Sequence, residues 1–152
     1  MKRQITGYHK DDEGDWVAEL DCFHNQHVRN QPPFTNRPWV ETEEGRQEKL
    51  GSELNCVRCD RLEFPDGLVA QRRTPEFNQD SIPAGLQRDH NTKKGVWGVI
   101  NVVEGELIYN VCEPEEQTFV LSQEKFGIIP PTMLHNVAAN GEVKFFVEFY
   151  SR

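Results

Sequence analysis

The chain has 152 residues, of which 17 are Lys or Arg and 25 are Asp or Glu, so its formal net charge is −8. No run of Lys or Arg exceeds two residues, and because phosphate contacts need a basic face, we expect no nucleic-acid partner. Acidic residues follow Lys2 and Arg3 where a signal peptide would be apolar, and no apolar run is long enough to span a membrane. We therefore expect a cytoplasmic protein without a membrane partner, whose four cysteines are thiols or metal ligands rather than disulfides.

The first half of the chain predicts few regular elements. Strands are expected at residues 3–8 and 16–20. Three prolines within residues 31–39 fix the backbone and remove hydrogen-bond donors, so no regular element is expected there. Residues 42–50 predict a short helix with almost no apolar face. Because only 36% of the chain is hydrophobic, this half would need a staple such as a metal ion to hold a fold.

The second half is rich in β-forming residues. Strands are expected at residues 96–103, 106–111, 118–121, 126–129, 134–138 and 143–150. Short strands at a spacing of roughly ten residues, broken by Gly and Pro, predict an all-β sandwich or barrel. Asn140-Gly141 lies between two apolar runs and predicts a hairpin turn. We place the domain boundary near residues 64–67, which divides the chain into domains 1–66 and 67–152.

A cluster of Cys and His residues in the first domain predicts a metal site. Cys56 and Cys59 form a Cys-x-x-Cys turn, in which two thiolates approach one ion from the same side. Residues i and i+2 of a strand share a face, so Cys22 and His24 would supply the other pair. Two pairs from distant segments predict a closed, zinc-ribbon-like site for a structural Zn²⁺ ion. His27 is an alternate fourth ligand if the backbone turns after His24.

Two other interpretations of these cysteines compete with structural zinc. In the first, the cysteines are ordinary buried thiols. In the second, Cys56 and Cys59 are a thioredoxin-like redox pair. The redox interpretation needs a βαβ unit around Cys56 and Cys59, and the neighbouring sequence does not predict one. We favour zinc, and a site with four protein ligands leaves no open position for catalysis.

Several motifs of the second half resemble a known bacterial module. They lie at residues 73–77 (RTPEF), 82–93 (IPAGLQRDHNTK), 95–98 (GVWG), 103–107 (VEGEL) and 146–150 (FVEFY). Residues 70–152 thereby resemble the TehB/YeaR-like cupin domain of tellurite-resistance proteins, and the first sixty residues resemble a small uncharacterised bacterial domain with the same Cys/His pattern. The resemblance implies a small antiparallel barrel that forms a homodimer. A methyltransferase follows this module in many such proteins, but no glycine-rich nucleotide loop occurs here, so we expect none.

The same resemblance directs attention to His90 and His135. Residues 129–135 are similar to the second cupin motif, whose final residue, His135, faces the barrel lumen. The first motif lacks its usual His and Glu ligands and offers only His90. Alternation along the last strand directs Glu148 away from the apolar face, so no third ligand is evident. His90 and His135 are therefore candidate pocket residues, for a small ligand or for a second metal.

These features favour a cytoplasmic stress-response protein of the tellurite-resistance type. Its first domain would be stabilised by zinc, and its cupin would bind a small molecule or oxyanion without catalysis. The alternative is a small metal-dependent cupin enzyme, of the oxygenase or isomerase class, that uses His90 and His135. A third interpretation is an adaptor whose zinc domain binds a protein partner.

Overall fold

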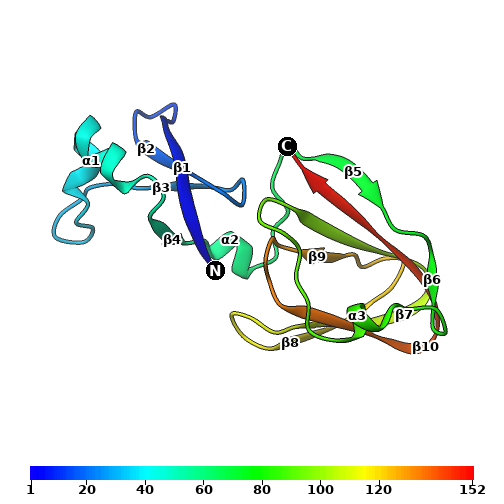
Figure 1. The fold of residues 1–152 in the computed structure, drawn as a ribbon. Coiled ribbons are helices and arrows are strands. Elements are labelled where there is room, and N and C mark those ends of the chain that lie inside the picture. Colours follow the sequence, from blue (N-terminus) through cyan, green and yellow to red (C-terminus); the bar gives the residue numbers. More distant parts are fainter. The chain divides into compact units, whose positions relative to one another are not determined.

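The computed structural model describes residues 1–152. The chain forms two compact units, an N-terminal unit of residues 1–58 and a barrel unit of residues 59–152 (Figure 1). Both consist mainly of antiparallel β-strands, as the sequence predicted. None of the helices combines the length and apolar character needed to cross a bilayer.

The N-terminal unit is built on a four-stranded antiparallel sheet in the order β3-β2-β1-β4. Its strands are β1 (Lys2–Lys10), β2 (Trp16–Leu20), β3 (Asn25–His27) and β4 (Glu53–Asn55). The expected strands at 3–8 and 16–20 are thus present. The apolar core is small and consists, besides cysteines, of the buried residues Ile5, Val17, Ala18, Leu20, Val28 and Val40.

This unit contains two short helices, η1 (Pro38–Glu41) and α1 (Glu43–Lys49), and the division between the two units falls inside a third, α2 (Val57–Asp60). The Thr42 side chain accepts a hydrogen bond from the Gly45 backbone N–H at 3.0 Å, which caps the start of α1. No residue of α1 is buried. The helix expected at 42–50 is confirmed by α1. Because none of its residues is buried, it adds nothing to the core.

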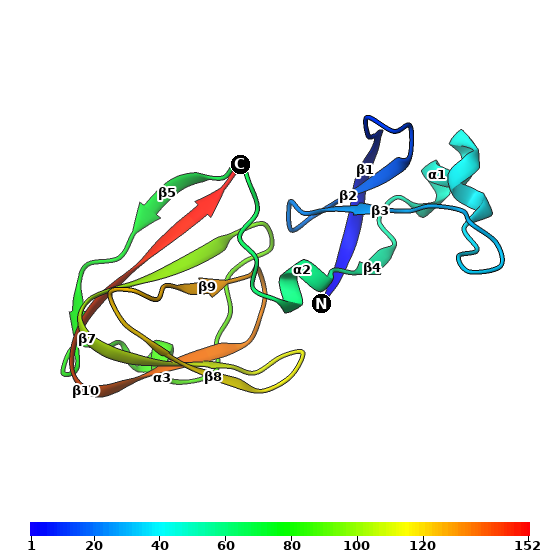
Figure 2. The same ribbon diagram turned by 180° about the vertical axis from the view of Figure 1, so that it is seen from behind.

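The barrel unit is a curved six-stranded antiparallel sheet (Figures 1 and 2). Its elements are β5 (Val69–Arg73), β6 (Phe77–Asn78), α3 (Ala84–Gln87), β7 (Trp97–Val111), β8 (Gln117–Leu121), β9 (Gly127–Ile129) and β10 (His135–Ser151). The path of the sheet is β5-β10-β7-β8, with β6 paired to β10 and β9 paired to β7. Both views show β7 and β10 as long, bent strands that lie side by side, and the other strands of the sheet pair with one or the other of them.

The hairpin turn predicted at Asn140-Gly141 is wrong, because β10 continues through these residues. The pairing of β10 with β7 shifts register between Ala139 and Val143, and Val143 pairs with Gly105. Gly105 and Gly141 have φ values of 74° and 83°, which side chains disfavour. Each glycine therefore bends a strand without ending it, and the four expected strands at 96–103, 106–111, 134–138 and 143–150 merge into β7 and β10.

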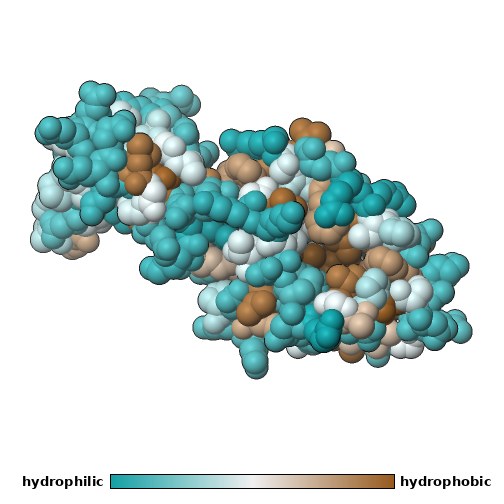
Figure 3. Space-filling model, viewed as in Figure 1, coloured by the Kyte–Doolittle hydropathy of each residue, from teal (hydrophilic) through white to brown (hydrophobic).

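One face of the bent sheet forms the core of the barrel unit. Along β10 the side chains of Val143, Phe145 and Val147 are buried, as the sequence alternation predicted. Tyr109 of β7 is buried with them, whereas Trp97 of β7 is buried against the ring of Phe64. Figure 3 shows hydrophobic side chains at the bottom of a hollow in this unit, with hydrophilic side chains around it.

Candidate metal centre and ligand cavity

Four predicted ligands meet in one buried cluster. One donor atom from each of Cys22, His24, Cys56 and Cys59 lies within 4.8 Å of the others. Their exposed fractions are between 0% and 3%. Three sulfurs and one imidazole nitrogen shielded from water in this way could hold a metal ion.

The separations within the cluster fit a tetrahedral ion. The Sγ atoms of Cys22 and Cys56 are 3.8 Å apart, and the Nδ1 atom of His24 lies 3.5 Å and 3.3 Å from them. In a tetrahedral zinc site two sulfurs lie about 3.8 Å apart, and a sulfur and a nitrogen about 3.5 Å apart. The sulfur separation is well above the roughly 2.05 Å of a disulfide bond, and none of the four cysteines forms a disulfide. Three cysteines and one histidine are also a ligand set that Zn²⁺ accepts.

The backbone around Cys22 is a turn rather than the expected strand. Phe23 has a φ of 73°, and its N–H donates to the Leu20 carbonyl at 2.9 Å. The N–H of Leu20 donates to the His24 carbonyl at 3.0 Å, which closes the turn between β2 and β3. The prediction that Cys22 and His24 share a strand face is therefore wrong. The tight turn itself brings the two side chains together.

The second pair is positioned by a helix. Cys56 immediately precedes α2, and Cys59 lies within it. The division between the two units falls inside this helix, after Arg58. Cys59 is therefore held beside Cys56 by local helical geometry.

The alternate ligand His27 lies outside the cluster. Its Nε2 atom is 2.7 Å from a carboxylate oxygen of Asp11, and its side chain is 51% exposed. A backbone hydrogen bond from Asp15 and the contact with His27 both lower the pKa of Asp11. The structure thus places His24, and not His27, with the three cysteines.

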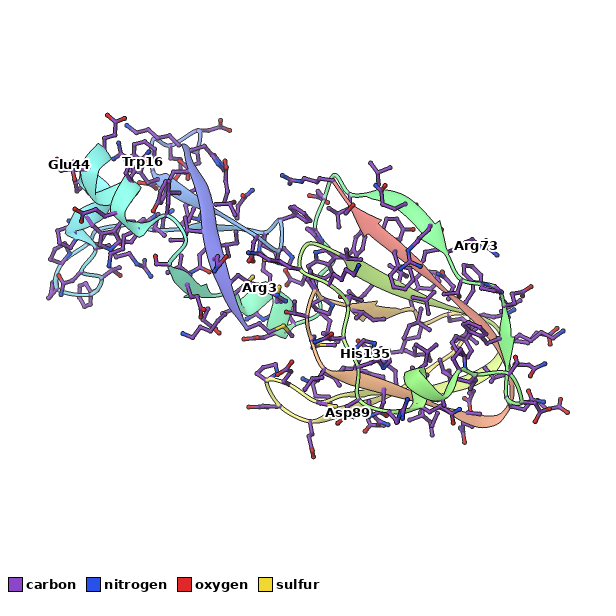
Figure 4. The ribbon with its side chains drawn as sticks, in the orientation of Figure 1. Arg3, Trp16, Glu44, Arg73, Asp89 and His135 are labelled. Carbon is purple, nitrogen blue, oxygen red and sulfur yellow. The ribbon has the colours of Figure 1, made fainter.

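The two histidines of the barrel unit are direct neighbours. His90 and His135 exchange two backbone hydrogen bonds of 3.0 Å, and their ring centroids are 4.1 Å apart. His135 begins β10 and is 1% exposed, whereas His90 is half-buried in the loop before β7. Figure 4 places His135 inside the curved sheet. The structure therefore brings together the two pocket residues that the sequence singled out.

Hydrogen bonds fix which ring nitrogen is free. The Nδ1 atoms of His90 and His135 lie 2.9 Å from the carbonyl oxygens of Arg88 and Met133. A carbonyl only accepts, so each Nδ1 carries a proton and each neutral ring keeps a lone pair on Nε2. Burial lowers the pKa of His135 to about 4, so this ring is neutral at pH 7. A free Nε2 atom opposite an Nδ1–H···O=C bond is the arrangement found in metal-binding histidines and also suits a ligand's hydrogen-bond donor.

Both rings line a cavity of about 480 Å³. Its walls are mainly apolar and include Ile100 of β7, Ile129 of β9, and Val137, Phe145 and Val147 of β10. Val147 and Phe149 line the cavity and Glu148 does not, in keeping with the expected alternation. A volume of this size is typical of small-molecule sites.

Sequence reasoning did not assign the two charged residues of this cavity, Arg72 and Lys93, to the site. Arg72 of β5 lines it, and its guanidinium lies 4.4 Å from the centroid of the Phe149 ring. Residues 69–73 were not predicted as a strand, and their position depends on pairing with β10. No local pattern around Arg72 could have indicated it.

The fold and the two candidate sites define a mainly β protein, with a Cys/His cluster followed by an antiparallel barrel unit that holds a cavity. Comparison with protein families agrees: the TehB-like domain family matches residues 72–147, half of the chain, and "Protein of unknown function (DUF3565)" matches residues 6–63. The chain belongs to the TehB-like domain family, which confirms the resemblance found in its motifs.

Curated relatives share the barrel unit. The chain is 27% identical over 99 residues to the uncharacterized protein YeaR of Escherichia coli K12, a match that covers 59% of this chain and 82% of YeaR. It is 28% identical over 76 residues to TehB of Haemophilus influenzae, described as a probable S-adenosyl-L-methionine-dependent methyltransferase. That match covers 47% of this chain and 27% of TehB, so the chain spans about a quarter of that relative.

Solved structures agree with these relationships. The crystal structure of TehB from H. influenzae has a TM-score of 0.53 at 25% identity and covers 57% of this chain and 32% of its own. A protein from E. coli K12 has a TM-score of 0.52 at 26% identity and covers 57% of this chain and 93% of its own. The shared part has the size of the barrel unit.

Proposed function

We propose that this protein is a ligand-binding member of its family that acts by binding rather than by turnover. The barrel unit holds a small molecule or oxyanion in the cavity beside His90 and His135. The observation that carries this proposal is the cavity of about 480 Å³ lined by both histidines, whose Nδ1 atoms are engaged by backbone carbonyls. The relationship to TehB supports a cytoplasmic stress response of the tellurite-resistance type as the setting, with a homodimer formed through the barrel unit.

The N-terminal unit is stabilised by Zn²⁺ bound to Cys22, His24, Cys56 and Cys59. The distances between the donor atoms and their burial support zinc, since the ion has no redox chemistry and accepts both thiolate and imidazole. When bound, the ion supplies folding free energy and a crosslink between the turn after β2 and the start of α2.

Metal analysis of purified protein tests this proposal. We expect one zinc per chain, lost in Cys56→Ser and retained in both His135→Ala and Cys112→Ser. Cys112 is a suitable control because its thiol lies outside the cluster, 3.5 Å from Asp89. Zinc that survives Cys56→Ser would contradict the proposal.

A metal-dependent cupin enzyme is the second candidate. The Nδ1–H···O=C bonds of His90 and His135 favour it, because they hold both rings as metal ligands are held. This candidate requires a second metal, such as iron, manganese or nickel, that disappears in His135→Ala while the zinc remains. A protein that contains zinc as its only metal and still binds a ligand in the cavity favours the first proposal.

A further inference from the structure

The charged side chains that line the cavity all have the same sign. Arg72 of β5 and Lys93 of the loop before β7 are the charged residues among them, and no Asp or Glu lines the cavity. Neither cation has a carboxylate within ion-pair distance. In a chain with 25 acidic residues and a net charge of −8, this local excess of positive charge favours an anion.

Asp89, the acid that precedes His90, is not among the residues that line the cavity. The Asp89 carboxylate accepts a hydrogen bond from the Asn136 side chain at 2.8 Å and lies 3.5 Å from the Cys112 thiol. Neither Asp89 nor these partners line the cavity. The Asp89 charge reaches His135, whose pKa it raises against the larger effect of burial, but Asp89 forms no ion pair with Arg72 or Lys93.

A compact oxyanion would not fill the cavity or cover its apolar walls. They are made of aliphatic and aromatic side chains, and the cavity of about 480 Å³ has room for many water molecules of about 30 Å³ each. An ion such as tellurite fills a small part of that volume and leaves the apolar walls in contact with water, which is unfavourable. An apolar body on the ligand would remove this water.

The polar groups of the cavity differ in how deeply they are buried. Arg72 and Lys93 are exposed, whereas His135 is 1% exposed. The stacking of Arg72 on Phe149 holds its guanidinium in place, where its planar donors can bind a carboxylate with two hydrogen bonds. At the deep end, the Nε2 atoms of the histidine pair accept a hydrogen bond and so select a ligand with an O–H or N–H group.

We infer that the cavity takes an amphipathic organic acid. Its anionic group lies at Arg72 and Lys93, its apolar body fills the cavity, and a hydroxyl or N–H group donates to His90 or His135. The inference rests on the proposed ligand-binding function of the barrel unit and names the chemical class of that ligand.

Four probes test the inference on the full, zinc-loaded chain by NMR titration. They are 6-hydroxy-2-naphthoate, its uncharged carboxamide, 2-naphthoate without the hydroxyl group, and sodium tellurite. Because hydrogen bonds to charged groups are worth more than neutral ones, we expect the hydroxy acid to bind about tenfold or more tightly than its carboxamide. It should also bind more tightly than 2-naphthoate and tellurite.

Matched variants locate the anionic group. Arg72→Ala and Lys93→Ala should each weaken binding of the hydroxy acid about tenfold and leave the carboxamide unaffected. Arg73→Ala is the control, since its guanidinium lies 3.9 Å from the centroid of the Phe146 ring and does not line the cavity. Unchanged melting temperatures would show that the variants remain folded.

The outcomes separate this inference from the function on which it rests. Equal binding of the acid and its carboxamide, or binding of the acid that survives both substitutions, would overturn the organic-acid class while keeping the cavity as a binding site. If tellurite binds more tightly than the hydroxy acid and this binding is lost in His135→Ala, the organic-acid class is also overturned, and the cavity is a site for an oxyanion. Failure of all four probes to bind would overturn both proposals.

Discussion

Removing one thiolate from the Cys/His cluster should unfold the N-terminal unit and spare the barrel unit. Cys56 is 2% exposed, and its sulfur lies 3.8 Å from that of Cys22 and 3.3 Å from Nδ1 of His24. Cys56→Ser leaves three ligands and a hydroxyl that is a poor substitute for thiolate. We expect zinc affinity to fall by more than about 100-fold, beyond the effect of losing an outer-shell partner.

The size of the effect follows from the small core. Five larger apolar side chains of this unit are buried, Ile5, Val17, Leu20, Val28 and Val40. At about 1.5–3 kcal/mol each they contribute about 8–15 kcal/mol. Structural zinc contributes about 10–16 kcal/mol, as much as this whole apolar term. A unit that loses a contribution of that size cannot stay folded, because domains have a net stability of only about 5–15 kcal/mol.

Amide NMR spectra and metal analysis measure both effects on one sample. In Cys56→Ser, the amide signals of residues 1–58 should collapse to unfolded positions while those of the barrel unit persist. Chelation of the wild-type protein should give the same spectrum, and Cys112→Ser should give the native one. A dispersed, native-like N-terminal unit in metal-free protein would refute the reasoning.

Three further predictions concern stability. Gly105→Ala should lower the free energy of unfolding by about 3 kcal/mol, because a side chain there would meet the Glu142 carbonyl. Gly141→Ala, with open space around it, should lower it by only about 1 kcal/mol, and thermal denaturation of both variants measures the difference. Because burial lowers the pKa of His135 from 6.5 to about 4, the unfolded chain binds a proton between these pH values and the folded chain does not. The free energy of unfolding should therefore fall by about 3 kcal/mol as the pH falls from 6.5 to 4, and urea titrations should show a shallower loss for His135→Asn. Thr42→Ala should cost about 1 kcal/mol by removing the cap of α1, seen as faster hydrogen exchange in that helix only.

The donor residues of the Cys/His cluster could be predicted from sequence, but their backbone could not. Spacing alone identified Cys56 and Cys59, because a Cys-x-x-Cys turn is a local pattern, and the Cys-x-His spacing singled out Cys22 with His24. The strand geometry assumed for Cys22 and His24 failed at Phe23, whose φ of 73° is rare for an aromatic residue and has no sequence signal. The choice between His24 and His27 likewise needed the path of the chain.

The barrel unit shows a second limit of local patterns. Asn-Gly marks a tight bend, but the sequence does not say whether the chain reverses there. In β10 the partner strand continues beside it and bends at Gly105, so the same residues form a bulge. The contribution of Arg72 to the cavity arises only once β5 pairs with β10. Such features come from pairing between residues far apart in the chain.

The two donor sets differ in what they leave free, and this decides where a function can reside. The Cys/His cluster offers four protein ligands, so an ion there has no open position for a substrate. The histidine pair offers two nitrogens and a cavity without a carboxylate, so an ion there would need further ligands from water or a bound molecule. The two candidate functions thus make opposite demands on the same Nε2 lone pairs. A ligand that donates to them competes with a metal, whereas a ligand that coordinates the metal binds cooperatively with it.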